Sequence, residues 1–183
     1  MEPRIEALLK SLEKTREDFW NIPPETGQFI NQVIRDRKYK TVFEIGTSNG
    51  YSGIWIAEAL SHTNGKLYTI ESHAKKRFGL ATENFKKSGL SKHIVQILGH
   101  APEAIPKNPE KFDMAFFDAT KGEHIDYWKE ISPRIKKGGI IITDNINSHK
   151  DDFVEYLKFI EKNKQFKSKI LNIGSGVLLS EKL

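Results

Sequence analysis

The chain of 183 residues contains no cysteine, which excludes a disulfide framework and thiolate chemistry. It also has no run of about 18 apolar residues, the length that a membrane-spanning helix needs. The charged start, Met1-Glu-Pro-Arg-Ile, lacks the features of a signal peptide. Together with the modest length, these absences predict a single cytoplasmic domain, residues 1–183, without a membrane partner.

Two common nucleotide-binding patterns are also missing from the most informative stretch, residues 41–57. A dinucleotide fingerprint, G-x-G-x-x-G, needs glycine where this chain has Ser48. A phosphate loop needs G-K-[ST] after the second glycine, where Tyr51 and Ser52 stand. A nicotinamide-dependent enzyme and a phosphate-loop enzyme are therefore disfavoured.

What this stretch does contain is a strand, a tight loop and a helix. The apolar run that ends at Ile45 is followed by Gly46 and Gly50, and residues 51–60 then carry apolar side chains at helical spacing. Glycines let a ligand approach the backbone closely, and the start of a helix offers free N–H groups. The pattern predicts a binding loop for a nucleotide-type ligand.

Acidic residues accompany this loop. Glu44 lies two residues before the first glycine, and Glu71 ends the next strand-like run, residues 67–70. A carboxylate at the end of the second strand can accept hydrogen bonds from both hydroxyls of a ribose. Glu71 is therefore the candidate for the ribose of the ligand.

Further oxygen donors follow two other buried-strand patterns. One strand pattern ends at Asp118, and another ends at Asp144 and Asn145. Parallel strands bring such ends to one edge of a sheet, and three hard oxygen donors suit Mg²⁺ or a similar ion. Each donor also has a purely structural interpretation, since Asp118 could cap a helix and the Asp144-Asn145 pair could form a turn.

Residues 43–52, Phe-Glu-Ile-Gly-Thr-Ser-Asn-Gly-Tyr-Ser, resemble the S-adenosylmethionine loop of class I methyltransferases. With residues 112–121 and 137–145, the chain is most similar to metal-dependent O-methyltransferases related to catechol and caffeoyl-CoA O-methyltransferases. The resemblance extends from about residue 24 to residue 180. It implies S-adenosylmethionine as cofactor, a divalent cation such as Mg²⁺, and a small hydroxylated acceptor.

The resemblance also implies the roles of individual residues. It places metal ligands at Asp118, Asp144 and Asn145 and a catalytic lysine at Lys121, which would take the hydroxyl proton or stabilise the oxyanion. The implied cofactor-binding residues are Glu44, Gly46, Thr47, Ser48, Gly50, Tyr51, Ser52, Glu71, His100, Ala101 and Asp118. The family commonly has an acid where this chain has His100, so the adenine contact stays open. Lys121 could also be an ordinary surface lysine at the start of a helix.

The fold is predicted to be α/β, a doubly wound and mainly parallel sheet that ends in an antiparallel hairpin. Helices are expected over residues 4–19, 25–37, 51–60, 73–87, 122–135 and 151–162, and the hairpin over residues 169–173 and 177–180. Residues 1–38 form N-terminal helices and residues 39–183 form the cofactor-binding core. The resemblance implies seven strands in the order 3-2-1-4-5-7-6.

Two features bear on the acceptor. The family usually has a longer insertion after the Asp-Asn pair, but here residues 146–150 lead almost directly into a helix. The acceptor pocket is therefore expected to be open, unless the N-terminal helix or a second subunit of a homodimer closes it. Aromatic side chains that could stack on a planar acceptor, each with core packing as the alternative, are Trp20, Tyr51 and Tyr127.

Three functions remain open from the sequence. The first is a metal-dependent O-methyltransferase that acts on a small catechol-like or vicinal-oxygen compound. The second is an RNA-directed methyltransferase of the same fold, which the net charge of +5 favours, although the basic residues are spread over predicted helices. The third is a protein that binds S-adenosylmethionine without turnover.

Overall fold

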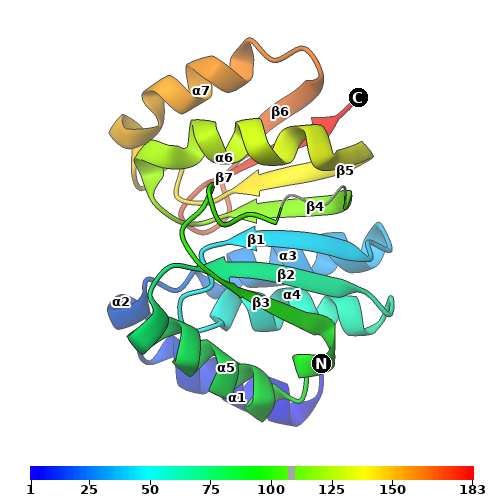
Figure 1. The fold of residues 1–183 in the computed structure, drawn as a ribbon, viewed down its shortest axis with the longest axis vertical. Helices are drawn as coiled ribbons and strands as arrows, with labels where there is room; N and C mark the ends of the chain where they lie inside the picture. The colour runs from blue at the N-terminus through cyan, green and yellow to red at the C-terminus, as the bar shows by residue number, and fades with distance from the viewer. Residues whose placement is uncertain (107–109) are drawn as a thin grey trace.

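The computed structural model describes residues 1–106 and 110–183. Its centre is a seven-stranded sheet in the order β3-β2-β1-β4-β5-β7-β6, which confirms the predicted order (Figure 1). The strands are β1 (Thr41–Ile45), β2 (Lys66–Glu71), β3 (Ile94–Leu98), β4 (Phe112–Phe117), β5 (Ile135–Thr143), β6 (Phe166–Leu171) and β7 (Val177–Lys182). The first five run parallel, and β7 pairs antiparallel with both β5 and β6.

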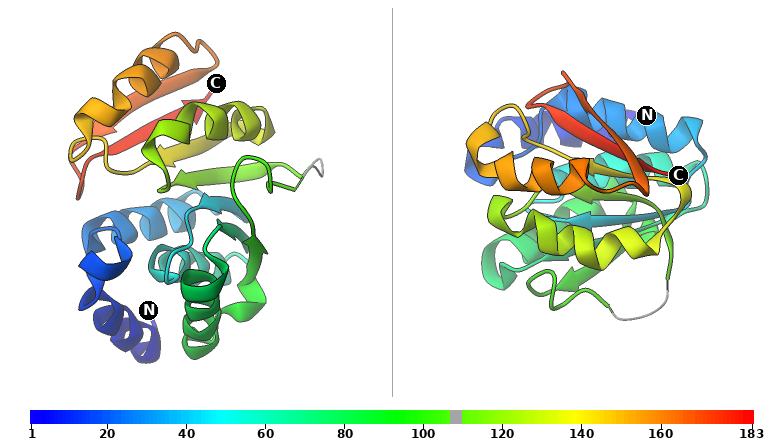
Figure 2. Two further views of the ribbon diagram at one scale, coloured as in Figure 1. Left: turned by 60° about the vertical axis from the view of Figure 1, so that its left-hand side comes forward. Right: turned by 90° about the horizontal axis from the view of Figure 1, so that it is seen from above.

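Helices cover both faces of the sheet (Figure 2). The α-helices are α1 (Pro3–Glu13), α2 (Arg16–Phe19), α3 (Pro24–Asp36), α4 (Tyr51–Ser61), α5 (Gly79–Ser88), α6 (His124–Ile131) and α7 (Val154–Glu161). Short 3₁₀ turns lie at η2 (Ser91–His93), η3 (Lys121–Glu123), η4 (Ser132–Arg134) and η5 (Lys150–Phe153), and η1 (Ala74–Phe78) is one π-helical turn.

The alternation of side chains along each strand separates two hydrophobic cores. Val42 and Phe116 point to the face covered by α1, α3, α4 and α5. Phe43 and Phe117, one residue further along, point to the face covered by α6 and α7. Because successive strand residues face opposite sides, a central strand must be apolar on both, as the sequence of β1 and β4 shows.

Two predicted helices are not continuous α-helices. The helix expected over residues 4–19 is divided into α1 and α2, because the carbonyl of Leu12 accepts hydrogen bonds from Thr15 Oγ1 and Asn21 Nδ2, both at 3.1 Å. The helix expected over residues 73–87 begins with the π-helical turn η1 before α5. Periodicity of apolar residues does not report either break.

Two later helices are shorter than predicted. The helix expected over residues 122–135 is α-helical only in α6, and Ile135 already begins β5 because Pro133 cannot donate a helical hydrogen bond. The helix expected over residues 151–162 starts as the 3₁₀ turn η5 and becomes α-helical at Val154. The predicted hairpin is present, with β6 beginning earlier, at Phe166.

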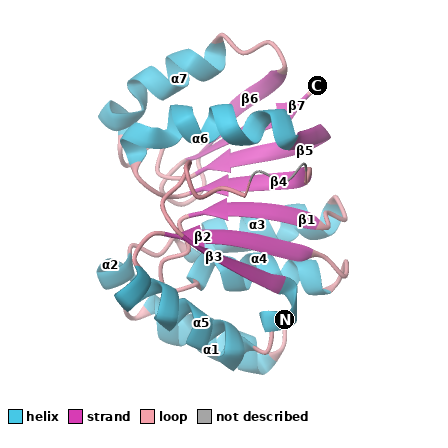
Figure 3. Ribbon diagram, in the orientation of Figure 1, coloured by secondary structure: helices cyan, strands magenta, loops and turns pink. Residues whose placement is uncertain are grey.

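The carboxyl ends of the parallel strands lie together at one edge of the sheet, where the arrowheads gather in Figure 3. The first residue beyond β4, Asp118, donates its backbone N–H to Ile45 (3.0 Å), and Asp144 donates its own to Phe117 (3.1 Å). These two bonds continue the sheet by one residue at each strand end. Asp118 and Asp144 are therefore set next to one another and next to the glycine loop.

In residues 1–106 and 110–183, the helices are all too short or too polar to cross a bilayer.

Candidate active site

A cavity of about 580 Å³ opens at the carboxyl edge of the sheet. Its wall is built by the loops after β1, β2, β3, β4 and β5, by the segment around α2, and by the β6–β7 turn. Nine of the predicted cofactor residues line it: Gly46, Thr47, Ser48, Tyr51, Ser52, Glu71, His100, Ala101 and Asp118. Glu44 and Gly50 are not on its wall.

The glycine loop crosses the ends of three strands at close range. Gly46 has φ +103°, and the backbone N–H groups of Gly46 and Thr47 both donate to the carbonyl of Ile70 (3.1 and 3.2 Å). A Cβ on Gly46 would lie 2.1 Å from the carbonyl oxygen of Asp118. Only glycine can occupy this position, because the backbone of β4 leaves no room for a side chain.

Glu71 is held at the cavity by backbone groups. Its carboxylate accepts the N–H of Ser48 on Oε2 and the N–H of His73 on Oε1, both at 2.8 Å. Each carboxylate oxygen can accept a second hydrogen bond. The side chain is thus fixed in orientation and still able to accept bonds from two neighbouring hydroxyls of a ligand.

Glu44 lies beneath the loop and is completely buried. Its carboxyl group accepts hydrogen bonds from Ser52 Oγ and Thr69 Oγ1, both at 2.6 Å. Burial raises the pKa of Glu44 from its ordinary 4.5 to about 7. Glu44 therefore ties α4 and β2 to the loop from behind, and it would shape the site without touching a ligand.

Glu44 makes the stability of the fold depend on pH. Because its pKa is about 7 when folded and 4.5 when unfolded, the stabilisation it gives is fully present below pH 4.5 and is lost as the pH rises to 7. The loss amounts to up to about 3 kcal/mol. Between pH 5 and pH 8 the wild type should lose this stabilisation, whereas Glu44→Gln should not. We therefore expect the free energy of unfolding of Glu44→Gln, relative to that of the wild type, to rise over this range.

Urea unfolding of both proteins at pH 5 and pH 8 measures this effect. Glu161→Gln, which changes an exposed carboxylate on α7, is the matched control and should follow the wild type at both pH values. An identical pH dependence of Glu44→Gln and the wild type would contradict the role given to Glu44.

The loop after β3 brings His100 to the cavity with an acid from another element. His100 Nε2 lies 3.1 Å from Glu123 Oε1, and Glu123 Oε2 accepts the hydroxyl of Tyr127 at 2.5 Å. His100 is thus held at the cavity by a carboxylate on η3. No local sequence pattern pointed to Glu123, because it lies 23 positions from His100.

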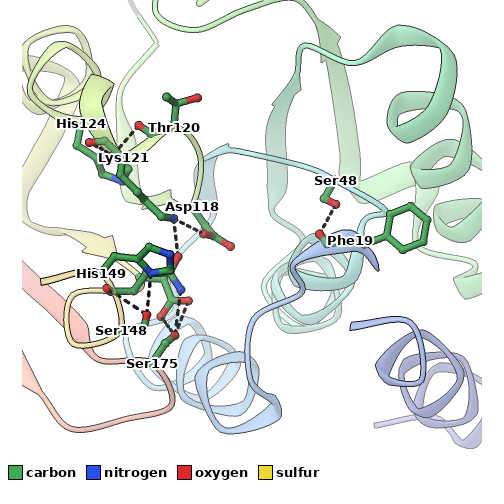
Figure 4. A network of polar contacts seen from close by, with 11 residues as sticks. Phe19, Ser48, Asp118, Thr120, Lys121, His124, Ser148, His149 and Ser175 are labelled. Carbon is green, nitrogen blue, oxygen red and sulfur yellow. Dashed lines mark hydrogen bonds and ion pairs between the residues drawn. The ribbon is translucent and has the colours of Figure 1, made fainter. Parts of the chain in front are cut away.

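The predicted catalytic lysine points toward Asp118 at the other end of the cavity (Figure 4), and it also contacts Asn145. Lys121 Nζ lies 3.2 Å from Asp118 Oδ1 and 2.5 Å from Asn145 Oδ1. Lys121, Asp118 and Asn145 all line the cavity. The interpretation of Lys121 as an ordinary surface lysine does not fit, since its side chain is only 20% exposed.

Asp144 lies just behind these residues and is fully buried. Burial, with the charge of Asp118 as the next cause, raises the pKa of Asp144 from its ordinary 3.8 to about 7. Ser175 Oγ donates to the carboxylate at 3.0 Å from Oδ1 and 2.9 Å from Oδ2. Asn145 Nδ2 in turn donates to Ser175 Oγ at 3.3 Å.

Sequence reasoning missed Ser175. It lies in the β6–β7 turn, 31 residues after Asp144, and reaches the site only because β7 runs antiparallel beside β5. Its backbone carbonyl also accepts the N–H of Asn147 and of Ser148, at 3.0 and 3.1 Å. The only sequence signal was the glycine pair Gly174 and Gly176, which predicted the turn but not its contact.

The donor set fits a divalent cation. Two neighbouring carboxylates, Asp118 and Asp144, with an amide oxygen beside them, are the hard oxygen ligands that Mg²⁺ prefers. Among the residues that the structure describes, no three His, Cys, Asp or Glu side chains form a metal cluster, so any site here depends on the oxygen of Asn145.

The segment around α2 forms the opposite wall. Ser48 Oγ donates to the carbonyl of Phe19 at 2.7 Å, and the Arg77 guanidinium stacks on Trp20, 4.7 Å from the ring centre. Trp20 is 72% exposed, whereas Tyr51 and Tyr127 are each 1% exposed. Of the three aromatic residues predicted to stack on an acceptor, the two tyrosines are therefore core residues with one edge at the cavity, and Trp20 alone offers a face.

The short segment after Asn145 also reaches the cavity. His149 lines it, donates its backbone N–H to Asn145 (3.0 Å) and places Nδ1 3.0 Å from Ser148 Oγ. With the α2 segment on the other side, this gives the pocket walls without a long insertion.

Comparison with known proteins decides the family. Residues 2–183 match the family model described as O-methyltransferase. The chain belongs to the O-methyltransferase family. This O-methyltransferase is a class I, S-adenosylmethionine-dependent enzyme, in agreement with the loop after β1 and with the strand order.

Its relatives point the same way. A catechol O-methyltransferase from Niastella koreensis is 32% identical over 130 residues, which cover 69% of this O-methyltransferase and 58% of that protein. A putative caffeoyl-CoA O-methyltransferase from Arabidopsis thaliana is 28% identical over 207 residues, covering 99% of this chain and 88% of the plant protein. The chain thus spans 58% of the length of the bacterial relative.

Among solved structures, an O-methyltransferase from Bacillus cereus in complex with SAH has the same fold. The TM-score is 0.86 at 22% identity, and the match covers 100% of this chain and 92% of that one.

Proposed function

We propose that this O-methyltransferase transfers the methyl group of S-adenosylmethionine to one hydroxyl of a small acceptor with two neighbouring oxygens, such as a catechol, with the help of Mg²⁺ or a similar cation. The observation that carries the proposal is the meeting of Lys121 Nζ with Asp118 and Asn145 on the cavity wall beside the glycine loop. The name of the Niastella koreensis relative, a catechol O-methyltransferase, supports the acceptor class.

Residues at one half of the cavity would hold the cofactor. Glu71, fixed by the N–H groups of Ser48 and His73, would accept bonds from the ribose hydroxyls. The loop at Gly46 lines the cavity and would lie against the ligand. His100 and Ala101 line the wall beyond Glu71 and would border the adenine.

Residues at the other half would prepare the acceptor. Transfer from a sulfonium is an in-line displacement, so the protein mainly has to hold the hydroxyl oxygen close to the methyl group and aligned with its bond to sulfur. Asp118, Asp144 and Asn145 would hold a divalent cation, which as a Lewis acid would lower the pKa of the acceptor hydroxyl. Lys121 would take the hydroxyl proton at Nζ as the neutral amine, after its ammonium has given up one proton to the solvent.

A methyl-transfer assay with labelled S-adenosylmethionine tests the proposal. The panel contains catechol-type diols, the matched phenols with one hydroxyl, and short RNAs, each with Mg²⁺ or with a chelator. We expect methylation of diols only, lost with the chelator and in Asp144→Ala. Equal transfer in the presence of chelator would contradict the metal, methylation of RNA would favour the RNA-directed alternative, and binding without transfer would favour the non-catalytic one.

Ser175→Ala is expected to weaken Mn²⁺ binding by about 10- to 100-fold, because Asp144 loses the hydroxyl that orients both of its oxygens. Titration calorimetry with Mn²⁺ measures the affinity. Ser168→Ala is the matched control, since its hydroxyl pairs with Ser180 Oγ on the same hairpin away from the cavity. An unchanged Mn²⁺ affinity in Ser175→Ala would show that the turn does not support the site.

A further inference from the structure

The ammonium of Lys121 contacts two of the three oxygen donors proposed for the metal. Nζ lies 3.2 Å from Asp118 Oδ1 and 2.5 Å from Asn145 Oδ1. The three side chains come from the end of β4, from η3 and from the loop after β5, so the contact is made by the tertiary structure. The ammonium of Lys121 thus occupies the position that a metal ion bound by these oxygens would take.

The charges around this position explain why a cation is needed. Asp118 and Asp144 are close enough that the charge of Asp118 raises the pKa of Asp144. In the described part of the chain, Lys121 is the only cationic side chain that contacts either carboxylate. His124, packed on the next turn, is buried with its pKa lowered to about 4 by burial and by the charge of Lys121, so it adds no charge. His149 faces Ser148.

One set of oxygens cannot serve both cations. A Mg²⁺ ion binds oxygen at about 2.0–2.1 Å and demands a fixed arrangement of ligands, which takes the lone pairs that now face the ammonium. Two like charges held a few ångströms apart also repel each other strongly in a half-buried site. Lys121 has a long, flexible side chain that is 20% exposed and lines the cavity. Its ammonium can therefore move into the cavity when a divalent ion binds.

We propose that Lys121 is the resident cation of this site and that a divalent ion binds by displacing it from Asp118 and Asn145. The displaced ammonium then lies free at the cavity, where it can give up a proton to the solvent and face the acceptor hydroxyl as the neutral amine. Binding of the metal and release of the catalytic lysine are in this way one event, and the metal-free enzyme keeps Lys121 in an ion pair. This inference rests on the proposed function, because it concerns the same metal site.

Equilibrium Mn²⁺ binding without cofactor or acceptor tests the displacement. Lys121→Met removes the competing charge and keeps the length of the stem, so it is expected to bind Mn²⁺ about tenfold more tightly than the wild type, or better. Lys121→Arg keeps the charge and should bind no more tightly than the wild type. Lys129→Met is the matched control, because it removes a lysine from an exposed ion pair with Asp126, and its affinity should be unchanged.

The outcomes separate this inference from the proposed function. Equal or weaker Mn²⁺ binding by Lys121→Met overturns the displacement and leaves the metal site standing. No Mn²⁺ binding by the wild type or by Lys121→Met overturns both the displacement and the metal in the proposed function. Binding of S-adenosylhomocysteine by each variant confirms that it is folded.

A second measurement uses the wild type alone, in case Lys121→Met does not fold. In protein labelled with ¹³C at the lysine ε-carbon, the Lys121 signal, assigned by its absence from Lys121→Arg, should shift as Mg²⁺ is added while the Lys129 signal stays. A Lys121 signal that does not respond at saturating Mg²⁺ overturns the displacement.

Discussion

Lys121→Met is expected to bind the cofactor like the wild type and to lose about 10²- to 10⁴-fold in kcat. A positioned group that takes a proton contributes a factor of this size, and Lys121 is the basic side chain placed between Asp118 and Asn145 on the cavity wall. Steady-state kinetics with a diol acceptor at saturating Mg²⁺ measures the loss. If the same variant binds the metal more tightly, the fall in kcat is caused by the missing proton acceptor and not by an unoccupied metal site.

Lys129→Met provides the comparison, since Lys129 is exposed and paired with Asp126 on α6. Its kcat should equal that of the wild type. A fall of less than about tenfold in Lys121→Met would mean that the cation alone activates the hydroxyl and that Lys121 has no part in proton transfer.

Gly46→Ala is expected to lower the free energy of unfolding by at least about 3 kcal/mol. The residue has φ +103°, a conformation that alanine rarely adopts, and its Cβ would lie 2.1 Å from the carbonyl oxygen of Asp118. Relief of that overlap requires β1 and β4 to separate at the point where the site is built. Urea unfolding measures the stability, and titration with S-adenosylhomocysteine shows whether the loop still binds.

Gly79→Ala is the matched control for this substitution. Gly79 begins α5, and a Cβ there would meet no atom within 4 Å, so alanine should leave the stability unchanged or raise it slightly. Equal stability of Gly46→Ala and Gly79→Ala would contradict the prediction. It would mean that the loop can shift to make room for the Cβ despite its two hydrogen bonds to Ile70.

Apolar patterning predicted where the strands and most helices lie, because a central strand that is buried on both faces is apolar at nearly every position. It failed at local breaks. The division of α1 from α2 depends on the hydroxyl of Thr15 and the amide of Asn21 reaching one carbonyl, and Ile135 passes from helix to strand through the missing N–H of Pro133. Such events involve single hydrogen bonds and leave the spacing of apolar residues unchanged.

The sequence by itself determined the family, the glycine loop and the oxygen donors at the ends of the strands, because each is carried by neighbouring residues in the chain. The tertiary structure alone decided what surrounds them. It brought Ser175 to Asp144, Glu123 to His100 and the ammonium of Lys121 to Asn145, across 31, 23 and 24 residues. Contacts of this kind depend on how strands and turns are placed beside one another, and no local pattern records that placement.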